Sequence, residues 1–241
     1  MTRLTRSSLS RVAVLAIAVP ALVAACSSGG GGAGTVAPAT PDPSAPAHTN
    51  GASPIAGYPE GCPTSQPEPL GTDQKRAVTI ATVQGDIDIE IDGALSPIAA
   101  GNFVALAECG WYDGVIFHRV IPGFVIQGGD GQYGRSPNVD PNQVGTGGPP
   151  YTIKDEPVTA AYGRGTVAMA RTPAPDSVGS QFFIVTDDAA QPPLASANTY
   201  QIIGTVTSGM ETVDAIVNAP TNASDFPDSP VVMNDVSVAT P

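Results

Sequence analysis

Short runs of β-branched and other apolar residues, several of them alternating with polar residues, recur along the chain from about residue 76. The first two runs, Ala77–Val83 and Ile87–Ile91, are separated by Gln84-Gly85-Asp86, which is typical of a tight turn. This pattern predicts an antiparallel hairpin. Runs of the same kind predict further strands at Val115–His118, Gly123–Gln127, Thr166–Ala170, Phe182–Thr186, Gln201–Val206 and Val231–Val238.

Two other segments have helical features. Ser96 and Pro97 provide an N-cap and a favourable first helical residue. Apolar residues follow at helical spacing as far as Ala107, and Gly110 lies beyond the end. A second helix is expected over Met210–Val217. Many short strands with two isolated helices favour a mainly all-β domain, an antiparallel barrel, which could bind a ligand, bind a partner or catalyse.

The N-terminal segment has the features of an export signal. Residues 1–11 contain three arginines and no acidic residue, and the apolar run Val12–Ala25 follows. That run has 14 residues, fewer than the roughly 20 that a membrane-spanning helix needs. A buried core helix is the alternative, but Pro20 and the four glycines at 29–32 argue against it.

The end of this apolar run, Val23-Ala24-Ala25-Cys26, resembles the lipobox of bacterial lipoproteins. The resemblance implies that a signal peptide, residues 1–25, is removed and that Cys26 is acylated. Two or more acyl chains bind a protein stably to a bilayer, whereas one alone binds only marginally. We therefore expect a protein anchored by lipid to the extracytoplasmic face of the cell membrane, with simple secretion as the alternative.

The segment after Cys26 has the composition of a tether. Of residues 27–57, 26 of 31 are Gly, Ser, Ala, Pro or Thr, which leaves too little apolar surface to offset the entropy of ordering. We therefore divide the chain into a signal peptide, a lipidated linker at 26–57, an irregular lead-in at 58–75 and a folded domain at 76–241.

The charge of the chain limits its partners. Ten basic residues stand against 22 acidic ones, a formal net charge of −12, which becomes −15 when residues 1–25 and their three arginines are removed. Because a phosphate backbone requires clustered Lys and Arg, no nucleic-acid partner is expected. The two histidines, His48 and His118, lie far apart in the sequence, so no His-rich metal site is expected either.

Two cysteines, Cys62 and Cys109, remain once Cys26 is assigned to the lipid. Outside the cytoplasm such a pair can oxidise, and the bridge would join the start of the folded region to the end of the first predicted helix. The alternative is two unpaired, small hydrophobic side chains. We predict the disulfide.

Three segments carry longer motifs: Phe117–Asp130 (FHRVIPGFVIQGGD), Gly165–Ala170 (GTVAMA) and Gly179–Ile184 (GSQFFI). They resemble the signature motifs of the cyclophilin family of peptidyl-prolyl cis-trans isomerases and occur in the family's order. The resemblance covers roughly residues 76–238. It implies an eight-stranded antiparallel β-barrel capped by two α-helices, with a groove for proline-containing polypeptides on its outer surface and no cofactor. Nothing in the sequence requires more than a monomer.

The resemblance also implies which residues act. Arg119 corresponds to the family's catalytic arginine, with Phe124 and Gln127 beside it. The other expected substrate contacts are Val125, Ala170, Arg171, Gln181, Phe183, Leu194 and Tyr200. Arg171 stands where the family usually has Asn, at a position thought to act largely through its backbone, and Tyr200 stands in the place of a groove histidine. The stretch 145–148 resembles the family loop beside the groove.

These residue types suit the rotation of an X-Pro bond. Rotation breaks amide resonance, with a barrier near 20 kcal/mol, but makes or breaks no bond, so neither a nucleophile nor a metal is required. A twisted amide has a pyramidal proline nitrogen, to which the guanidinium of Arg119 could donate a hydrogen bond. Phe124 and Phe183 would belong to an apolar cup around the ring, while Gln127 and Gln181 would bind the substrate backbone.

Several residues with catalytic potential have simpler interpretations. His118 is expected in the core because the reaction transfers no proton, and Phe117 and Phe182 are assigned to the core, whereas Phe183 is assigned to the groove. Residues 128–131 (GGDG) lack the Lys-Ser/Thr of a phosphate-binding loop and are expected to form a turn. Ser180 lacks a nucleophile-elbow pattern.

Three functions remain open at this point. The leading one is an active folding isomerase outside the cytoplasm. The second is a non-catalytic chaperone or binding module that uses the same groove for proline-containing segments. The third is a structural surface lipoprotein, which predicts no groove.

Overall fold

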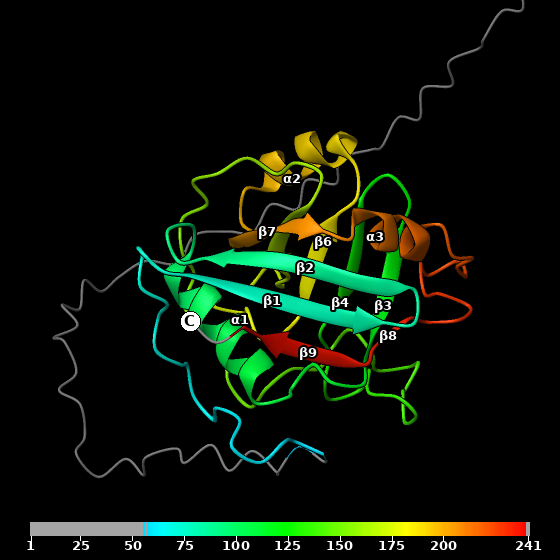
Figure 1. The fold of residues 1–241 in the computed structure, drawn as a ribbon, viewed down its shortest axis with the longest axis horizontal. Helices are drawn as coiled ribbons and strands as arrows, with labels where there is room; N and C mark the ends of the chain where they lie inside the picture. The colour runs from blue at the N-terminus through cyan, green and yellow to red at the C-terminus, as the bar shows by residue number, and fades with distance from the viewer. Residues whose placement is uncertain (1–54, 56, 240–241) are drawn as a thin grey trace, which may run out of the picture. The chain divides into compact units, whose positions relative to one another are not determined.

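A computed structural model describes Ile55 and residues 57–239. The predicted signal peptide, Cys26 and nearly all of the predicted linker lie outside these residues. Within the described part of the chain, no helix combines the length and the apolar character needed to cross a membrane. The described residues form a strongly curved sheet with helices packed around it (Figure 1).

The described residues contain nine strands and three α-helices. The strands are β1 (Lys75–Thr82), β2 (Gly85–Asp92), β3 (Val115–Ile121), β4 (Val125–Gly128), β5 (Thr166–Met169), β6 (Phe182–Val185), β7 (Ile202–Ser208), β8 (Val232–Met233) and β9 (Asp235–Val238). The helices are α1 (Pro97–Glu108), α2 (Gln191–Ala197) and α3 (Met210–Val217), with a 3-10 turn, η1 (Asp188–Ala190), before α2.

The sheet is antiparallel throughout, in the order β8-β3-β4-β6-β5-β7-β2-β1-β9. The predicted hairpin is confirmed as β1 and β2, in which Ile80 lies opposite Ile87. Both side chains are fully buried, and the polar residues that alternate with them face outward. The all-β barrel expected from the sequence is therefore the fold observed.

The two edges of the nearly closed barrel meet at one residue, Asn234, between the last two strands. The sequence predicts a single strand over Val231–Val238, but this segment divides at Asn234 into β8, which pairs with β3, and β9, which pairs with β1. The backbone N–H of Asn234 donates to the carbonyl of Ala81 at 2.8 Å. The two edges of the sheet are thus joined through Asn234, which raises the strand count from the expected eight to nine.

The helices α1 and α3 lie near opposite ends of β2 (Figure 1), and both were predicted from the sequence. The helix α2 was not predicted, so the expectation of two helices is wrong by one. Its first turn contains Pro192 and Pro193, and proline is a poor helix former in a helix interior; near a helix start, however, proline removes only N–H groups that have no intrahelical partner. Asn198, with a φ of 44°, ends the helix.

The core inside the barrel is built around four aromatic rings that touch one another. Phe182 contacts Phe103, Tyr112 and Phe117 edge to face, with ring centroids 5.2 to 6.3 Å apart. All four side chains are fully buried. A second, smaller cluster includes Val125, Phe183, Leu194 and Ile202 and is separate from this core. As predicted, Phe117 and Phe182 are core residues, whereas Phe183 faces the other side of the sheet.

The lead-in to the domain packs across α1. Cys62 and Cys109 form the predicted disulfide, which connects residues 47 positions apart. Farther along, a Cβ at position 101 would lie only 2.3 Å from the carbonyl oxygen of Glu68, so only glycine permits this close approach of the lead-in to α1. Leu70 is buried, and its N–H donates to the carbonyl of Pro97. Residues before the first strand are therefore part of the packed structure.

We predict that the Cys62→Ser/Cys109→Ser double variant unfolds more readily than the wild type. Cross-linking across 47 residues restricts the unfolded chain, which is worth up to about 4 kcal/mol in the free energy of unfolding. Urea unfolding followed by the fluorescence of Trp111, the single tryptophan, measures this difference. Wild type treated with a reductant should match the variant. Equal midpoints, or two free thiols in the denatured, unreduced protein, would contradict the prediction.

Candidate active site

A small pocket lies on the outer face of the sheet, with a volume of about 130 Å³. We call it the Arg119 pocket; its lining residues are Arg119, Phe124, Val125, Gln127, Ala170, Arg171, Phe183, Leu194 and Tyr200. These are nine of the ten residues that the family resemblance implies act or touch substrate. The tenth, Gln181, lines an adjoining cavity and contacts Gln127. Residues spread over 82 positions of sequence are thus brought to one place.

The strands bring these side chains together by register. On β4, Val125 and Gln127 point outward while Ile126 between them is fully buried. Gln127 lies opposite Arg119 on β3 and opposite Phe183 on β6. The helix α2, which was not predicted, contributes Leu194 to the lining of the pocket, where the residue is 3% exposed. One face of three neighbouring strands and one helix therefore supplies the pocket.

A β-bulge at His118 is what turns Arg119 outward. Phe117 pairs with Gly128 and Arg119 pairs with Gln127, so β3 advances two residues where β4 advances one. In a regular strand, residues two apart share a face, and Arg119 would point into the core beside Phe117. The bulge places Phe117 inside and Arg119 outside. Neither the hydrophobic pattern nor the motif showed this irregularity.

The guanidinium of Arg119 begins a chain of side-chain hydrogen bonds. Its Nη1 donates to Oε1 of Gln127 at 3.3 Å, and Nε2 of Gln127 donates to Oε1 of Gln181 at 3.0 Å. Nε2 of Gln181 then donates to the carbonyl of Gly147 at 2.9 Å. Because a guanidinium has donors only, the first bond determines the orientation of both amide groups. On its other side Arg119 has Asp225, whose Oδ2 lies 3.7 Å from Nε in a solvent-exposed pair.

A buried carboxylate positions the last acceptor of that chain. Asp130 is fully buried and accepts hydrogen bonds from the backbone N–H groups of Gln132, Tyr133, Gly145 and Gly147. A Cβ at Gly147 would lie 2.4 Å from Oδ1 of Asp130, so the site requires glycine. The turn expected at 128–131 begins only at Gly131, because Gly128 is the last residue of β4. The role of Asp130 in holding the loop beside the groove was missed.

A second, larger cavity continues from the Arg119 pocket, with a volume of about 980 Å³. We call it the long groove. It shares Gln127, Ala170 and Arg171 with the Arg119 pocket, and the loop 145–148 lines it as expected. Gln181 also lines the long groove and donates to the carbonyl of Gly147 in that loop. An extended peptide with one side chain in the Arg119 pocket would continue into the long groove.

Tyr200 forms part of the wall at the far end of the Arg119 pocket. Its ring lies edge to face with that of Phe183, with the centroids 5.4 Å apart. The hydroxyl of Tyr162 donates to the carbonyl of Tyr200 at 2.8 Å and accepts from its N–H at 3.2 Å. The aromatic wall is therefore held through the backbone of Tyr200 rather than through its own hydroxyl group.

His118 and Ser180 take no part in the pocket. Ser180 is buried and its hydroxyl donates to the carbonyl of Gly129 at 2.7 Å, which agrees with the absence of a nucleophile-elbow pattern. His118 is buried as expected, but neither ring nitrogen has a hydrogen-bond partner among the described residues. Burial lowers the pKa of His118 to about 4, although the negative charge of Asp130 opposes the shift. His118 is therefore neutral at pH 7.

Comparison with known proteins identifies the class to which this fold and pocket belong. Residues 77–238 match the family model described as cyclophilin type peptidyl-prolyl cis-trans isomerase/CLD. The chain belongs to this family, and it is a peptidyl-prolyl cis-trans isomerase.

Three similar proteins illustrate the relation. A probable peptidyl-prolyl cis-trans isomerase of Brucella abortus (strain 2308) is 40% identical over 146 residues, 60% of this chain and 72% of that protein. A peptidyl-prolyl cis-trans isomerase of Acinetobacter baylyi is 40% identical over 167 residues, 67% of this chain and 84% of its own. The crystal structure of a Cryptosporidium parvum cyclophilin type isomerase has a TM-score of 0.59 and 32% identity, covering 70% of this chain and 99% of that one.

We predict that His118 makes the protein less stable as the pH falls from about 6.5 towards 4. An unfolded histidine has a pKa near 6.5, so below that pH the unfolded chain binds a proton that folded His118, with a pKa of about 4, does not. Between pH 7.5 and pH 5 the wild type should lose about 2 kcal/mol more unfolding free energy than His118→Gln. Urea unfolding at the two pH values measures this. An equal loss in both proteins would contradict it.

Proposed function

We propose that Arg119 stabilises the twisted amide of an X-Pro bond bound in the Arg119 pocket, and that the protein does this outside the cytoplasm from a lipid anchor. The observation that carries the proposal is the presence of one guanidinium beside the apolar side chains Phe124, Val125, Phe183 and Leu194 in the lining of a pocket of about 130 Å³. A cavity of that size suits a single compact side chain such as a proline ring. A dipeptide Ala-Pro was present with one similar crystal structure, of a Cryptosporidium parvum cyclophilin type isomerase, which supports this choice of ligand.

The chemistry follows from what planar and twisted amides offer to a donor. The nitrogen of a planar amide shares its lone pair with the carbonyl and accepts hydrogen bonds poorly. At the twisted state the lone pair is localised on nitrogen, so a donor beside it is bound more strongly in the transition state than in either planar form. Nη1 of Arg119 donates to Gln127, and Nη2 has no acceptor among the described residues, which leaves it available to the substrate.

The apolar wall would hold the ring while the preceding carbonyl rotates. Phe124, Val125, Phe183 and Leu194 line one side of the Arg119 pocket, and none of them carries a polar group that could compete with the guanidinium. Gln127 and Gln181 present amide groups without charge, which suit hydrogen bonds to the backbone of the substrate. Pre-aligned donors of this kind typically contribute a few kcal/mol of transition-state stabilisation.

We predict that Arg119→Ala lowers kcat/KM for a proline-containing peptide by about 10²–10³-fold, the loss usual for one donor to a developing lone pair or charge. Arg119→Lys should recover only part of this, because an ammonium lacks the fork of donors. A protease-coupled isomerisation assay measures the rates. Arg76→Ala is the matched control: within the described part of the chain the Arg76 side chain donates only to Lys75 and Gln74, and Arg76 lines neither cavity.

Two outcomes of that assay would oppose the proposal. If folded Arg119→Ala keeps the wild-type rate, another group stabilises the twisted amide. If wild type binds proline peptides without accelerating their isomerisation, the chain is the non-catalytic binding module considered above.

The proposed location rests on the N-terminal segment and on the disulfide. The basic and apolar segments before Cys26 have the order of an export signal, and Val23–Ala25 fit the lipobox. The bond between Cys62 and Cys109 favours an oxidising compartment. We propose that the protein acts as a monomer at the extracytoplasmic face of the cell membrane.

We predict that the natural protein has a diacylated Cys26 as its first residue and fractionates with membranes, because two acyl chains suffice for stable binding. Cys26→Ala should move most of the protein to the soluble fraction. Mass spectrometry of the purified N-terminus, together with fractionation of both proteins, measures this. An unmodified Cys26, or cleavage at another residue, would contradict the anchor.

A further inference from the structure

Arg171 lies between the two cavities but does not direct its charge into either. It is one of three residues that line both the Arg119 pocket and the long groove. Its side chain is only 10% exposed, whereas the side chain of Arg119 is 41% exposed. An arginine that bound substrate through its guanidinium would be accessible from the groove. The expectation that Arg171 acts through its backbone accounts for its place in the wall, but it leaves the long side chain without a role.

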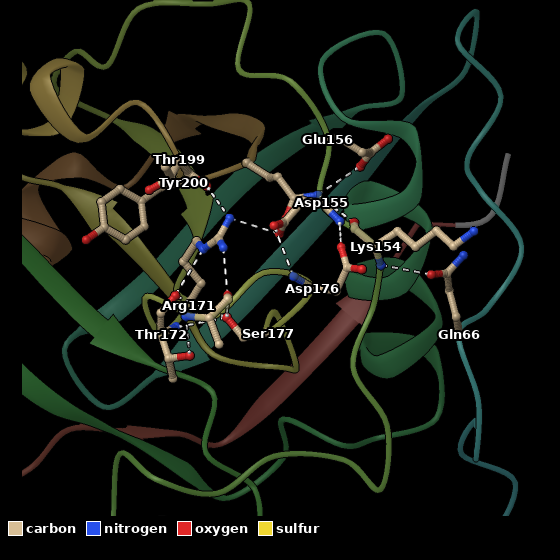
Figure 2. Close-up of polar contacts among 12 residues, drawn as sticks. Gln66, Lys154, Asp155, Glu156, Arg171, Thr172, Asp176, Ser177, Thr199 and Tyr200 are labelled. Atoms are coloured by element: carbon tan, nitrogen blue, oxygen red, sulfur yellow. Dashed lines mark hydrogen bonds and ion pairs between the residues drawn. The ribbon is translucent and has the colours of Figure 1, made fainter. Parts of the chain in front are cut away.

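The guanidinium of Arg171 joins three separate stretches of chain (Figure 2). Its Nη1 lies 2.9 Å from Oδ1 of Asp155 and 3.5 Å from the carbonyl of Thr199. Its Nε donates to the carbonyl of Thr172 at 3.1 Å, and Nη2 donates to that of Ala174 at 2.8 Å. One side chain thus forms an ion pair with Asp155 and hydrogen bonds with carbonyls at residues 172–174 and 199, which belong to three different loops.

A second set of bonds connects two of these loops directly. The N–H of Asp155 donates to Oδ1 of Asp176 at 2.8 Å, and the N–H of Asp176 donates to Oδ2 of Asp155 at 3.0 Å. Asp176 has a φ of 52°, a strained value for a residue with a side chain. This reciprocal pair brings two carboxylates together, which is unfavourable unless a positive charge lies beside them. The guanidinium of Arg171 supplies that charge.

The loop that carries Asp155 is itself hydrogen-bonded to the lead-in and to α1. The N–H of Lys154 donates to Oε1 of Gln66 in the lead-in at 3.0 Å (Figure 2). Next to it, Glu156 accepts hydrogen bonds from the first free N–H groups of α1, those of Ile98 and Ala99, both at 2.9 Å. Asp155 therefore gives Arg171 a partner attached to α1 and to the disulfide-bonded lead-in, so the ion pair with Asp155 can hold the other two loops in place.

Those two loops form walls of the candidate site. The carbonyl of Thr199, which Arg171 contacts, precedes Tyr200, whose ring packs on Phe183 in the Arg119 pocket. Arg171, Thr172 and Ser177, at the two ends of the other loop, line the long groove. The hydroxyl of Ser177 lies within hydrogen-bond distance of the carbonyls of Thr172 and Ala174, so this turn is closed on itself. It is attached to the Asp155 loop both through Arg171 and through Asp176.

We propose that Arg171 is a positioning residue for the isomerase: its guanidinium fixes the wall between the Arg119 pocket and the long groove, through Asp155, without touching the substrate. The proposal rests on the isomerase activity of the family but not on the role proposed for Arg119. A wall that is already ordered spares the substrate the cost of ordering it on binding. Since the wall is equally ordered in the ground and transition states, losing it weakens binding uniformly and raises KM more than it changes kcat.

The test compares Arg171→Gln, Asp155→Asn and the double variant in the full-length protein. Steady-state kcat and KM are measured with one proline-containing peptide. Each single variant should raise KM about tenfold and leave kcat within about twofold. The double variant should be no worse than either single one, because both changes break the same contact. Arg171→Lys should be intermediate, since it can keep the ion pair with Asp155 but not all three carbonyl contacts.

Arg164→Gln is the matched control. Arg164 also pairs with an aspartate, Asp214 at 2.8 Å, and also donates to a backbone carbonyl, that of Thr186, but it lines neither cavity. Because Arg164 lies outside both cavities, this variant should leave KM and kcat unchanged.

Three results would overturn the proposal. If Arg171→Gln lowers the melting temperature with kcat and KM both unchanged, Arg171 has a structural role only. If kcat falls while KM stays the same, the guanidinium acts on the reacting amide. If Arg171→Gln raises KM and Asp155→Asn does not, Arg171 contacts the substrate directly. An inactive wild type would contradict the isomerase function instead and is seen in the same assay.

Discussion

Strand β3 places Phe117 in the barrel core and Arg119 on the outer surface, although side chains two residues apart in a regular strand share a face. The bulge at His118 allows Phe117 to face the core and Arg119 to face outward, and the rest of the site depends on it. With Arg119 facing outward it lies opposite Gln127, and the outward residues of β4 and β6 complete the pocket. A one-residue slip would put a guanidinium into a core of aromatic rings, at a prohibitive cost in desolvation.

The bulge has its own cost, which the structure shows at His118. The extra residue is buried next to the loop 145–147 with no hydrogen-bond partner in the described range for either ring nitrogen. Its pKa is lowered to about 4, so the ring stays neutral and adds no positive charge beside Arg119. The buried carboxylate of Asp130 uses its acceptors on backbone N–H groups instead, and thereby positions the loop that binds Gln181.

Local patterns predicted those parts of the fold in which near neighbours in sequence decide the structure. The β1–β2 hairpin, α1 and α3 follow from alternation, capping and helical spacing, and the disulfide followed from counting cysteines. The helix α2 was missed because Pro192 and Pro193 are poor helix formers except in a first turn, which is where they lie. The break at Asn234 was missed because it depends on two distant strands, β1 and β3, competing for one segment.

The site residues came from the family resemblance, and the structure brings all ten of them together around two adjoining cavities. What the motifs could not show is how each side chain is held. Asp130 acts through the backbone of a loop 15 and 17 residues away, and Arg171 acts through Asp155, 16 residues earlier. Such contacts depend on the closed barrel, which no local pattern contains.

Exchange NMR on a bound X-Pro peptide tests the central claim, the role of Arg119, most directly, since it separates the rate of rotation on the protein from the affinity for the peptide. Our account predicts that Arg119→Ala binds the peptide nearly as well as wild type but interconverts its cis and trans forms at least 100-fold more slowly, roughly the value of one such donor. Equal interconversion rates in the two bound complexes would contradict it.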